Sequence, residues 1–536
     1  MENRQPAKLP LFDFVGRPPT FRRTTSYTSS ASTSDSSTYL SSPPTSSPSL
    51  DGNESIPEEK DRQRPLYPVT ELKRWRLRDD AATLSVPPPA VIPAPDEPKP
   101  ESSALGITII GTGFAGLSTA IACARQGFDV TVLERSILRT YFGDSIVLGS
   151  NCTRTLHKWG IGEEMRKKST QGKWWIIYDK DGKELYREDL QLLAEMYGAP
   201  LLQGKRSHFT GVLSQEAIRL GVKFKYNAEV TGYSDSQDKP AVMLRGGELL
   251  RSDVVVVCDG AKSSARTLMA SKDSTPFRRK GSGYSINRAI ICSKSIQNDP
   301  RCSHLVDGSI RIYLGDNAHA EIWPLGVGDQ VAFTFTHLDL DRSATLDWKT
   351  TTSLSTIDLT DWTPVLQAAV EHFPIAHNWM ILQDDVEPGW VSKGGKIVFA
   401  GDAVHPLSPA SFQGATQAIE DGATIALCLV LAGGTSKGVP IALKAYERLR
   451  RERAEEAGAL GRLVRASRWG RYAGFSETTQ DATPLRPLNF EMYDFDAEDF
   501  ARENWDKVVD QLKAEALVAS PATGGYTSRY FAETVG

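Results

Sequence analysis

The 536-residue chain lacks an apolar run long enough to cross a bilayer, and its first residues contain no apolar core of a secretory signal. Its longest candidate, Ala423 to Ala432, falls short of the roughly 18 apolar residues that a spanning helix needs. Basic charge is not in excess, because 62 Lys and Arg stand against 66 Asp and Glu. The sequence therefore predicts a cytoplasmic protein with no transmembrane segment and no nucleic-acid partner.

Cysteine is scarce and scattered. The chain has 6 cysteines and no CxxC pair, so neither a zinc site nor a disulfide framework is expected. This usage fits a reducing compartment, and the sequence predicts no metal site. The cysteines are Cys123, Cys152, Cys258, Cys292, Cys302 and Cys428.

Apolar residues are also sparse in the first hundred positions. Thr24 to Ser49 is mostly Ser, Thr and Pro, and Val86 to Pro100 is rich in proline. Such composition buries too little apolar surface to offset the entropy of ordering, so residues 1–104 are predicted to form a disordered tail. Arginines beside the Ser/Thr tract leave an organelle transit peptide open as an alternative, although nearby acidic residues favour a solvated tail.

An ordered pattern begins at Leu105. Ile107 to Ile110 and Asp129 to Leu133 read as short buried strands, and the Ala-rich segment Phe114 to Gln126 between them has helical spacing. A strand, a helix and a strand within about thirty residues predict a parallel sheet.

Later segments extend this pattern. Two further buried strands are expected to end in glycine-containing turns, at Asp253 to Val257 and Lys396 to Ala400. Alternating residues between about Phe277 and His337 favour an antiparallel sheet, and two long helices are expected at Gly414 to Leu431 and Pro440 to Ser467.

The first chemical motif is Gly111-Thr112-Gly113-Phe114-Ala115-Gly116, between the first strand and its helix. Glycines there allow a tight turn and let backbone N–H groups approach a pyrophosphate at the positive end of the helix. Glu134 ends the second strand, where its carboxylate can accept hydrogen bonds from ribose hydroxyls. The motif predicts an adenosine dinucleotide site, without separating FAD from NAD.

Two further motifs follow predicted strands, at the edge where α/β sheets bind ligands. One is Asp259-Gly260, with Ser264 and Arg266 after it; the other is Gly401-Asp402. Asp402 is placed to bind a ribityl or phosphate-linked hydroxyl. The helix that starts at Gly414 can offer its first N–H groups to a flavin ring.

With these three motifs in this order, the chain resembles the single-component FAD-dependent aromatic hydroxylases, especially the fungal salicylate-hydroxylase-like monooxygenases. The resemblance spans Gly106 to Trp505. It implies the para-hydroxybenzoate-hydroxylase fold, an α/β fold with a Rossmann-type FAD domain, an inserted mixed β-sheet substrate domain and C-terminal helices. The implied division is FAD domain 105–198, 199–275 and 380–470, substrate domain 276–379, and C-terminal segment 471–536.

The resemblance also implies roles for individual residues. Arg288 aligns with an arginine that contacts the substrate or its phenolate in some relatives; a surface or interdomain salt-bridge arginine is the alternative. Trp323 stands where several relatives carry a tyrosine before proline, and an indole shapes an apolar pocket without relaying a phenol proton. The residues expected to hold FAD are Gly111, Gly113, Ala115, Gly116, Glu134, Ser145, Arg154, Arg206, Asp259, Asp402, Gly414 and Ala415.

For the reaction, the resemblance implies that NAD(P)H reduces FAD and that O2 then supplies the oxygen that hydroxylates or epoxidises an electron-rich small molecule. A phenolic or polyketide-type secondary metabolite is the expected substrate class. No second nucleotide-binding GxGxxG is present, so NAD(P)H is expected to dock transiently. Three alternatives remain open: an uncoupled oxidase, a halogenase-like enzyme, and a non-catalytic FAD-binding protein.

Overall fold

The structure is a computed structural model that describes residues 104–136, 144–236, 238–268, 279–326, 329–339, 350–384, 389–470 and 490–518. The predicted tail up to residue 103 and part of the predicted C-terminal segment lie outside these residues. All the described residues belong to one compact unit.

A five-stranded parallel sheet forms where the sequence predicts a βαβ unit. The helix α1 (Phe114–Arg125) connects its strands β1 and β2. Because the carboxyl ends of parallel strands meet at one edge, the three motifs that follow β1, β12 and β19 come together there. The strand order is β19 (Ile397–Phe399), β12 (Val254–Val257), β1 (Gly106–Ile110), β2 (Asp129–Leu133) and β8 (Lys223–Lys225).

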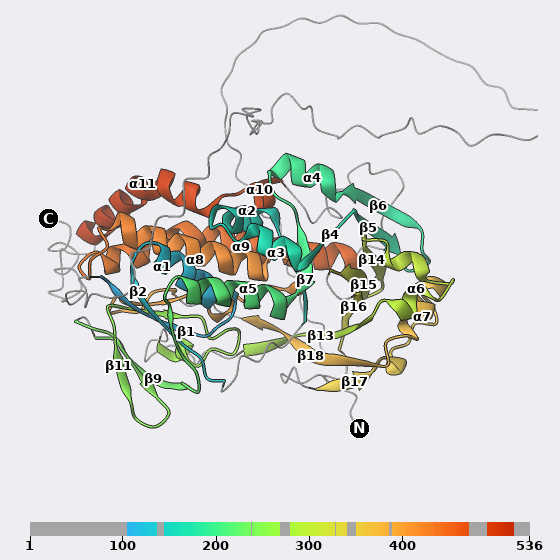
Figure 1. The fold of residues 1–536 in the computed structure, drawn as a ribbon, viewed down its shortest axis with the longest axis horizontal. Coiled ribbons are helices and arrows are strands. Elements are labelled where there is room, and N and C mark those ends of the chain that lie inside the picture. The colour runs from blue at the N-terminus through green and yellow to red at the C-terminus, as the bar shows by residue number, and fades with distance from the viewer. Residues whose placement is uncertain are drawn as a thin grey trace, which may run out of the picture. The chain divides into compact units, whose positions relative to one another are not determined.

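Four helices pack together beside this sheet: α1, α8 (Gly414–Leu431), α9 (Val439–Gly470) and α11 (Ala497–Val518). The helix α1 contacts the sheet directly, and α11 packs on α8 and α9, as Figure 1 shows. Within the described residues, α8 is the one helix long and apolar enough to span a membrane, but 83% of it is buried inside the fold. A Cβ at Gly422 would lie 2.5 Å from the Thr119 nitrogen, so α8 packs closely against α1. It is a core helix in this structure.

A second, eight-stranded sheet is mixed, with one parallel pair between β14 and β5. The alternation predicted between residues 277 and 337 corresponds to its antiparallel centre. The order is β17 (Thr351–Ser353), β18 (Ile375–Asp384), β13 (Arg279–Cys292), β16 (Gln330–Leu338), β15 (Ala318–Leu325), β14 (Ile310–Gly315), β5 (Trp174–Asp179) and β6 (Glu184–Asp189).

The last two strands come from an unexpected part of the chain. Residues 105–198 are predicted to belong to the FAD domain, yet β5 pairs with β14 and β6 pairs with β5. The segment Trp174–Asp189 therefore completes the eight-stranded sheet, which is not built from 276–379 alone. Local pattern gives no such indication, because strand partners are chosen by contacts distant in sequence.

The remaining described elements form two small sheets and several further helices. Two three-stranded sheets consist of β11 (Leu249–Arg251), β10 (Ala241–Leu244) and β9 (Val230–Ser234), and of β3 (Ser145–Leu148), β7 (Leu202–Lys205) and β4 (Ser169–Gln171). The other helices are α2 (Ser150–Lys158), α3 (Gly162–Lys167), α4 (Leu190–Tyr197), α5 (Arg206–Arg219), α6 (Lys294–Gln297), α7 (Pro364–Val370) and α10 (Phe490–Tyr493).

The two faces of the eight-stranded sheet have different neighbours. One face carries Trp175, Trp323 and Ala332 and packs against Leu407 and Phe412, which lie between the Gly401-Asp402 motif and α8. The opposite face packs against α6, α7 and the turn between α6 and β14. We call the first the inner face, since it is the one turned toward the nucleotide motifs.

Candidate functional site

Each glycine of the first motif has a different steric environment. Gly111 has φ +103°, and a Cβ there would lie 2.5 Å from the Cys258 carbonyl oxygen. A Cβ at Gly116 would lie 2.0 Å from the Gly111 carbonyl oxygen, so this position holds helix and turn in close contact. At Gly113, by contrast, a Cβ would meet only the Arg206 Nη2 at 3.9 Å. The backbone is therefore open at Gly113, where a pyrophosphate would approach.

Glu134 stands at the end of β2 as predicted. Its Oε2 accepts hydrogen bonds from the Thr112 hydroxyl at 2.7 Å and the Thr112 amide at 3.1 Å, and its Oε1 accepts from the Ser136 amide at 2.9 Å. Burial alone would raise the pKa of Glu134, but these donors at Ser136 and Thr112 outweigh it and lower the pKa. The carboxylate is thus held charged beside the glycine loop, as an acceptor of ribose hydroxyls requires.

Arg206 begins α5, and its guanidinium lies over the Phe114 ring with its central carbon 5.7 Å from the ring centroid. Its proximity to Gly113 places a fixed positive charge at the N-terminus of α1. That helix has no side-chain cap, so its first amides are open to an anion. Ser145, buried at the start of β3, pairs across the sheet with the residue before Arg206.

The second and third motifs are tied together by Arg266. This buried guanidinium donates from Nε to the Ala403 carbonyl at 2.6 Å and from Nη2 to the Asp402 carbonyl at 2.7 Å. Arg266 therefore fixes the turn from which the Asp402 carboxylate projects. In the described part of the chain, that carboxylate has no hydrogen-bond donor.

One oxygen of Asp259, Oδ1, is buried and has no hydrogen-bond partner among the described residues. Burial raises the pKa of Asp259. Buried polar atoms are nearly always hydrogen-bonded, so the Asp259 Oδ1 fits a bound group that carries a hydroxyl. The half-buried Asp402 carboxylate is available to accept from the same group.

The N-terminus of α8 supplies a further site. Gln413 precedes the helix without a side-chain cap, and a Cβ at Gly414 would meet nothing within 4 Å. The first amides of this 18-residue helix thus face open space at its positive end. Ala415 packs against the core of the parallel sheet, as does Ala115, whose Cβ would lie 2.8 Å from a Cβ at Gly401.

A buried ionic network lies directly behind these motifs. Arg450 contacts Glu420 at 2.6 Å and Asp421 at 3.0 Å, and Arg453 contacts Glu420 at 2.7 Å. Asp421 Oδ2 in turn accepts from the Gly401 amide at 2.8 Å and meets the His405 Nε2 at 2.6 Å. The network therefore holds the Gly401-Asp402 turn against α8.

The charges in this network are matched. Burial would raise the pKa of Glu420, but Arg453 and Arg450 outweigh it and lower the pKa. Burial would also raise the pKa of Asp421, but His405 and Arg450 bring it down to about 2. The sequence analysis did not predict the network. Its one signal was Glu420-Asp421 in an otherwise apolar helix, because charges buried there need partners.

Arg154, predicted to hold FAD, is engaged elsewhere in the structure. It pairs with Asp494 at 2.8 Å and donates to the Tyr197 carbonyl, so it links α2 to the segment that follows α10. Its contact with FAD stays a prediction.

Arg288 and Trp323 are brought to the same face of the eight-stranded sheet. Directly opposed residues of antiparallel strands share a face, and the pairs run from Arg288 to Thr334 and from Thr334 to Glu321. Trp323 lies two residues beyond Glu321 and belongs to the inner-face core. Arg288 Nε, Trp323 Nε1 and Thr334 Oγ1 are buried without partners among the described residues.

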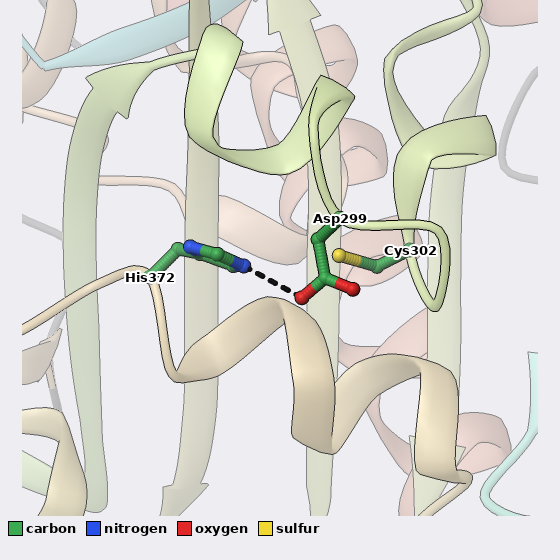
Figure 2. A group of neighbouring side chains, drawn as sticks. All are labelled: Asp299, Cys302 and His372. Atoms are coloured by element: carbon green, nitrogen blue, oxygen red, sulfur yellow. Dashed lines mark hydrogen bonds and ion pairs between the residues drawn. The ribbon is translucent and has the colours of Figure 1, made fainter.

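One group of potential metal ligands lies away from these motifs, among the described residues. Asp299, Cys302 and His372 have ligand atoms within 4.8 Å of one another, and His372 Nε2 lies 3.0 Å from Asp299 Oδ2 (Figure 2). Arg301 already contacts both Asp299 oxygens, and burial raises the pKa of the Cys302 thiol to about 11. An ion pair and a buried thiol explain the cluster, which offers no support for a metal.

Comparison with known proteins decides the family. The model of the FAD binding domain family matches residues 105–459. The chain belongs to the FAD-dependent monooxygenases. It is 30% identical to the FAD-dependent monooxygenase nanF of Aspergillus nanangensis over 371 residues, which cover 66% of this chain and 79% of the relative. It is 31% identical to Asperlicin C monooxygenase of Petromyces alliaceus over 378 residues, 66% of this chain and 78% of the relative.

Solved structures agree on the fold of this monooxygenase. CtdE in complex with FAD and a substrate has a TM-score of 0.65 at 23% identity, covering 76% of this chain and 99% of that chain. A salicylate hydroxylase substrate complex has a TM-score of 0.63 at 20% identity, covering 75% and 98%. The predicted family, α/β fold and FAD cofactor are thereby confirmed. The open backbone at Gly113 and Gly414 leaves room for such a cofactor, and the contacts of the single residues with it stay predictions.

Proposed function

We propose that this FAD-dependent monooxygenase uses NAD(P)H and O2 to hydroxylate or epoxidise an electron-rich small molecule, a phenolic or polyketide-type secondary metabolite. One observation carries the proposal: the inner face with Arg288 and Trp323 packs against Leu407 and Phe412, directly before the α8 N-terminus. A substrate on that face would lie next to a flavin held at α8. The name of one fungal relative, Asperlicin C monooxygenase, supports a small organic molecule as the substrate.

The bound FAD supplies the redox and oxygen chemistry. The chain's own residues position the substrate and the cofactor, shield them from water and polarise the substrate. Trp175 stacks edge-on against Phe412, with ring centroids 4.9 Å apart, and with Trp323 it forms an apolar wall that excludes water. Arg288 offers fixed donors to a substrate oxygen, and the α8 amides and Asp402 orient the cofactor.

Turnover with product analysis tests the proposal. The purified holoenzyme is mixed with NADH or NADPH, with and without a panel of phenolic and polyketide acceptors, and the products are weighed by mass spectrometry. An acceptor that accelerates oxidation and gains one oxygen atom supports the monooxygenase. Steady oxidation that yields only hydrogen peroxide with every acceptor points to an oxidase, a halogenated product to a halogenase-like enzyme, and no turnover to a non-catalytic FAD-binding protein.

Asp402→Ala is expected to purify largely without flavin. The carboxylate has no protein donor in the described structure, so its loss removes a charged acceptor from the cofactor and costs the protein no internal bond. A hydrogen bond to a charged group contributes about 1.5–3 kcal/mol, which corresponds to a loss of affinity of roughly 10- to 150-fold. The ratio of flavin to protein absorbance measures this, and a fully yellow variant with unchanged FAD affinity would contradict the assignment.

Deletion of residues 1–98 is expected to leave turnover and flavin content unchanged, because every cofactor motif begins at or after Gly111. The truncated chain and the full chain are compared for flavin content and for NAD(P)H oxidation with the same acceptor. Loss of protein yield or of turnover on truncation would show that the tail contributes to the folded enzyme.

A further inference from the structure

Arg288 reaches the inner face with a counter-ion already in place. Its Nη1 donates to Asp144 Oδ2 and lies 3.4 Å from the Ser145 carbonyl oxygen. We propose that Asp144 determines substrate specificity by neutralising the charge of Arg288. The site therefore accepts a substrate whose oxygen is neutral, such as a ketone, amide or un-ionised phenol, and rejects a carboxylate or other anion. The inference rests on the proposed function, since it describes the substrate of that site.

Asp144 is held firmly in this position. Its carbonyl oxygen accepts from the Arg206 amide at 2.7 Å, and its Oδ1 accepts from the Ser145 amide at 2.7 Å. The side chains of Arg288 and Asp144 are only 18% and 25% exposed, so solvent screens their attraction incompletely. An anionic substrate would have to displace a carboxylate that the backbone keeps in place.

Arg288 nevertheless retains donors for a neutral ligand. A guanidinium carries five N–H groups, and the hydrogen bonds of Arg288 to described residues all use Nη1. Its Nη2 has no acceptor in the described part of the chain. A carbonyl or hydroxyl oxygen can accept from these groups without bringing a second negative charge toward Asp144.

A second acidic side chain, Glu321, lies on the same face of the sheet. Glu321 is buried in the same row of opposed residues as Arg288, with Thr334 between them, and its Oε1 lies 3.4 Å from the His319 Nε2. Neighbouring strands are spaced about 4.8 Å apart, so Glu321 stands roughly 10 Å from Arg288 across the sheet.

Benzoate and benzamide test the proposal, because they have the same shape and differ in charge. Their dissociation constants for the holoenzyme are measured near neutral pH by calorimetry and by the change in flavin absorbance. The wild-type protein is expected to bind benzamide more tightly than benzoate. In Asp144→Asn, benzoate affinity is expected to rise at least about tenfold, since the variant leaves Arg288 without its counter-ion, while benzamide affinity stays within about twofold.

Asp307→Asn is the matched control, because it breaks another ion pair of the same sheet, Arg311–Asp307 at 2.8 Å. Arg311 lies on the opposite face of that sheet, where it is paired with Ile322. The control variant is expected to leave both affinities unchanged. If Asp144→Asn does not fold, Asp144→Ala replaces it as the test variant. Benzoate binding that fails to improve in a folded Asp144 variant, or a wild-type preference for benzoate, overturns the proposal.

These measurements need no turnover, so the two proposals can fail separately. If anion discrimination depends on Asp144 but the enzyme oxygenates no acceptor, only the proposed function is wrong. Oxygenation without this discrimination would sink the specificity role alone.

Discussion

Gly116→Ala is expected to destabilise the protein by at least about 3 kcal/mol, the upper end of what overpacking typically costs. We also expect it to abolish FAD retention. An alanine Cβ would lie 2.0 Å from the Gly111 carbonyl oxygen, which is backbone and has no rotamer to change. Either α1 or the turn must move, and both frame the pyrophosphate site. The thermal unfolding midpoint and the flavin content of the purified variant measure the two effects.

Gly458→Ala is the matched control, since it makes the same change inside another helix. A Cβ there would meet the flexible Arg462 Nη1 at 3.3 Å, and alanine favours a helix over glycine by about 1 kcal/mol. That variant should be as stable as the parent or slightly more so. Equal behaviour of the two variants would mean that the close contact at Gly116 does not constrain the loop.

Glu420→Gln is expected to cost about 3–5 kcal/mol, because it leaves two buried guanidinium groups with a single remaining carboxylate. Glu420 is fully buried and accepts from Arg450, Arg453 and the Asn151 amide at 2.6 to 2.9 Å. The amide retains the shape but removes the charge and turns one acceptor into a donor. We expect a large drop in the unfolding midpoint, accompanied by flavin loss as the Gly401 turn loosens.

Glu163→Gln provides the comparison, since Glu163 forms a solvent-exposed pair with Arg166 at 2.7 Å. Exposed pairs contribute little, so its unfolding midpoint should match that of the parent. If Glu420→Gln also matched the parent, the buried network would not support the cofactor turn.

The local geometry of the first glycine motif and of Glu134 was predictable from sequence because its constraints are local. Gly111 and Gly116 must be glycine for reasons within one turn, and Glu134 is placed by a strand that ends beside it. The partners of the arginines were not predictable. Arg154 pairs with a residue 340 positions away and Arg288 with one 144 positions away. The sequence left Arg288 as either a substrate contact or a salt-bridge arginine and could not name its counter-ion.

The assignment of β5 and β6 to the eight-stranded sheet was not predictable for the same reason. Trp174–Asp189 has an ordinary strand pattern, and only the contact of β5 with β14 assigns it to the larger sheet. Long-range pairing and buried charge matching depend on the assembled fold, which short sequence windows do not contain.

The split origin of the eight-stranded sheet limits how such enzymes can be recombined. Its strands come from two stretches, Trp174–Asp189 and residues 279–384, with β12 of the parallel sheet between them in the chain. A chimera that exchanges only the second stretch would join a foreign β14 to the native β5 inside the wall that carries Trp175. Grafting the specificity of a relative onto this scaffold therefore requires both stretches to be exchanged together, as one spatial cassette encoded in two pieces.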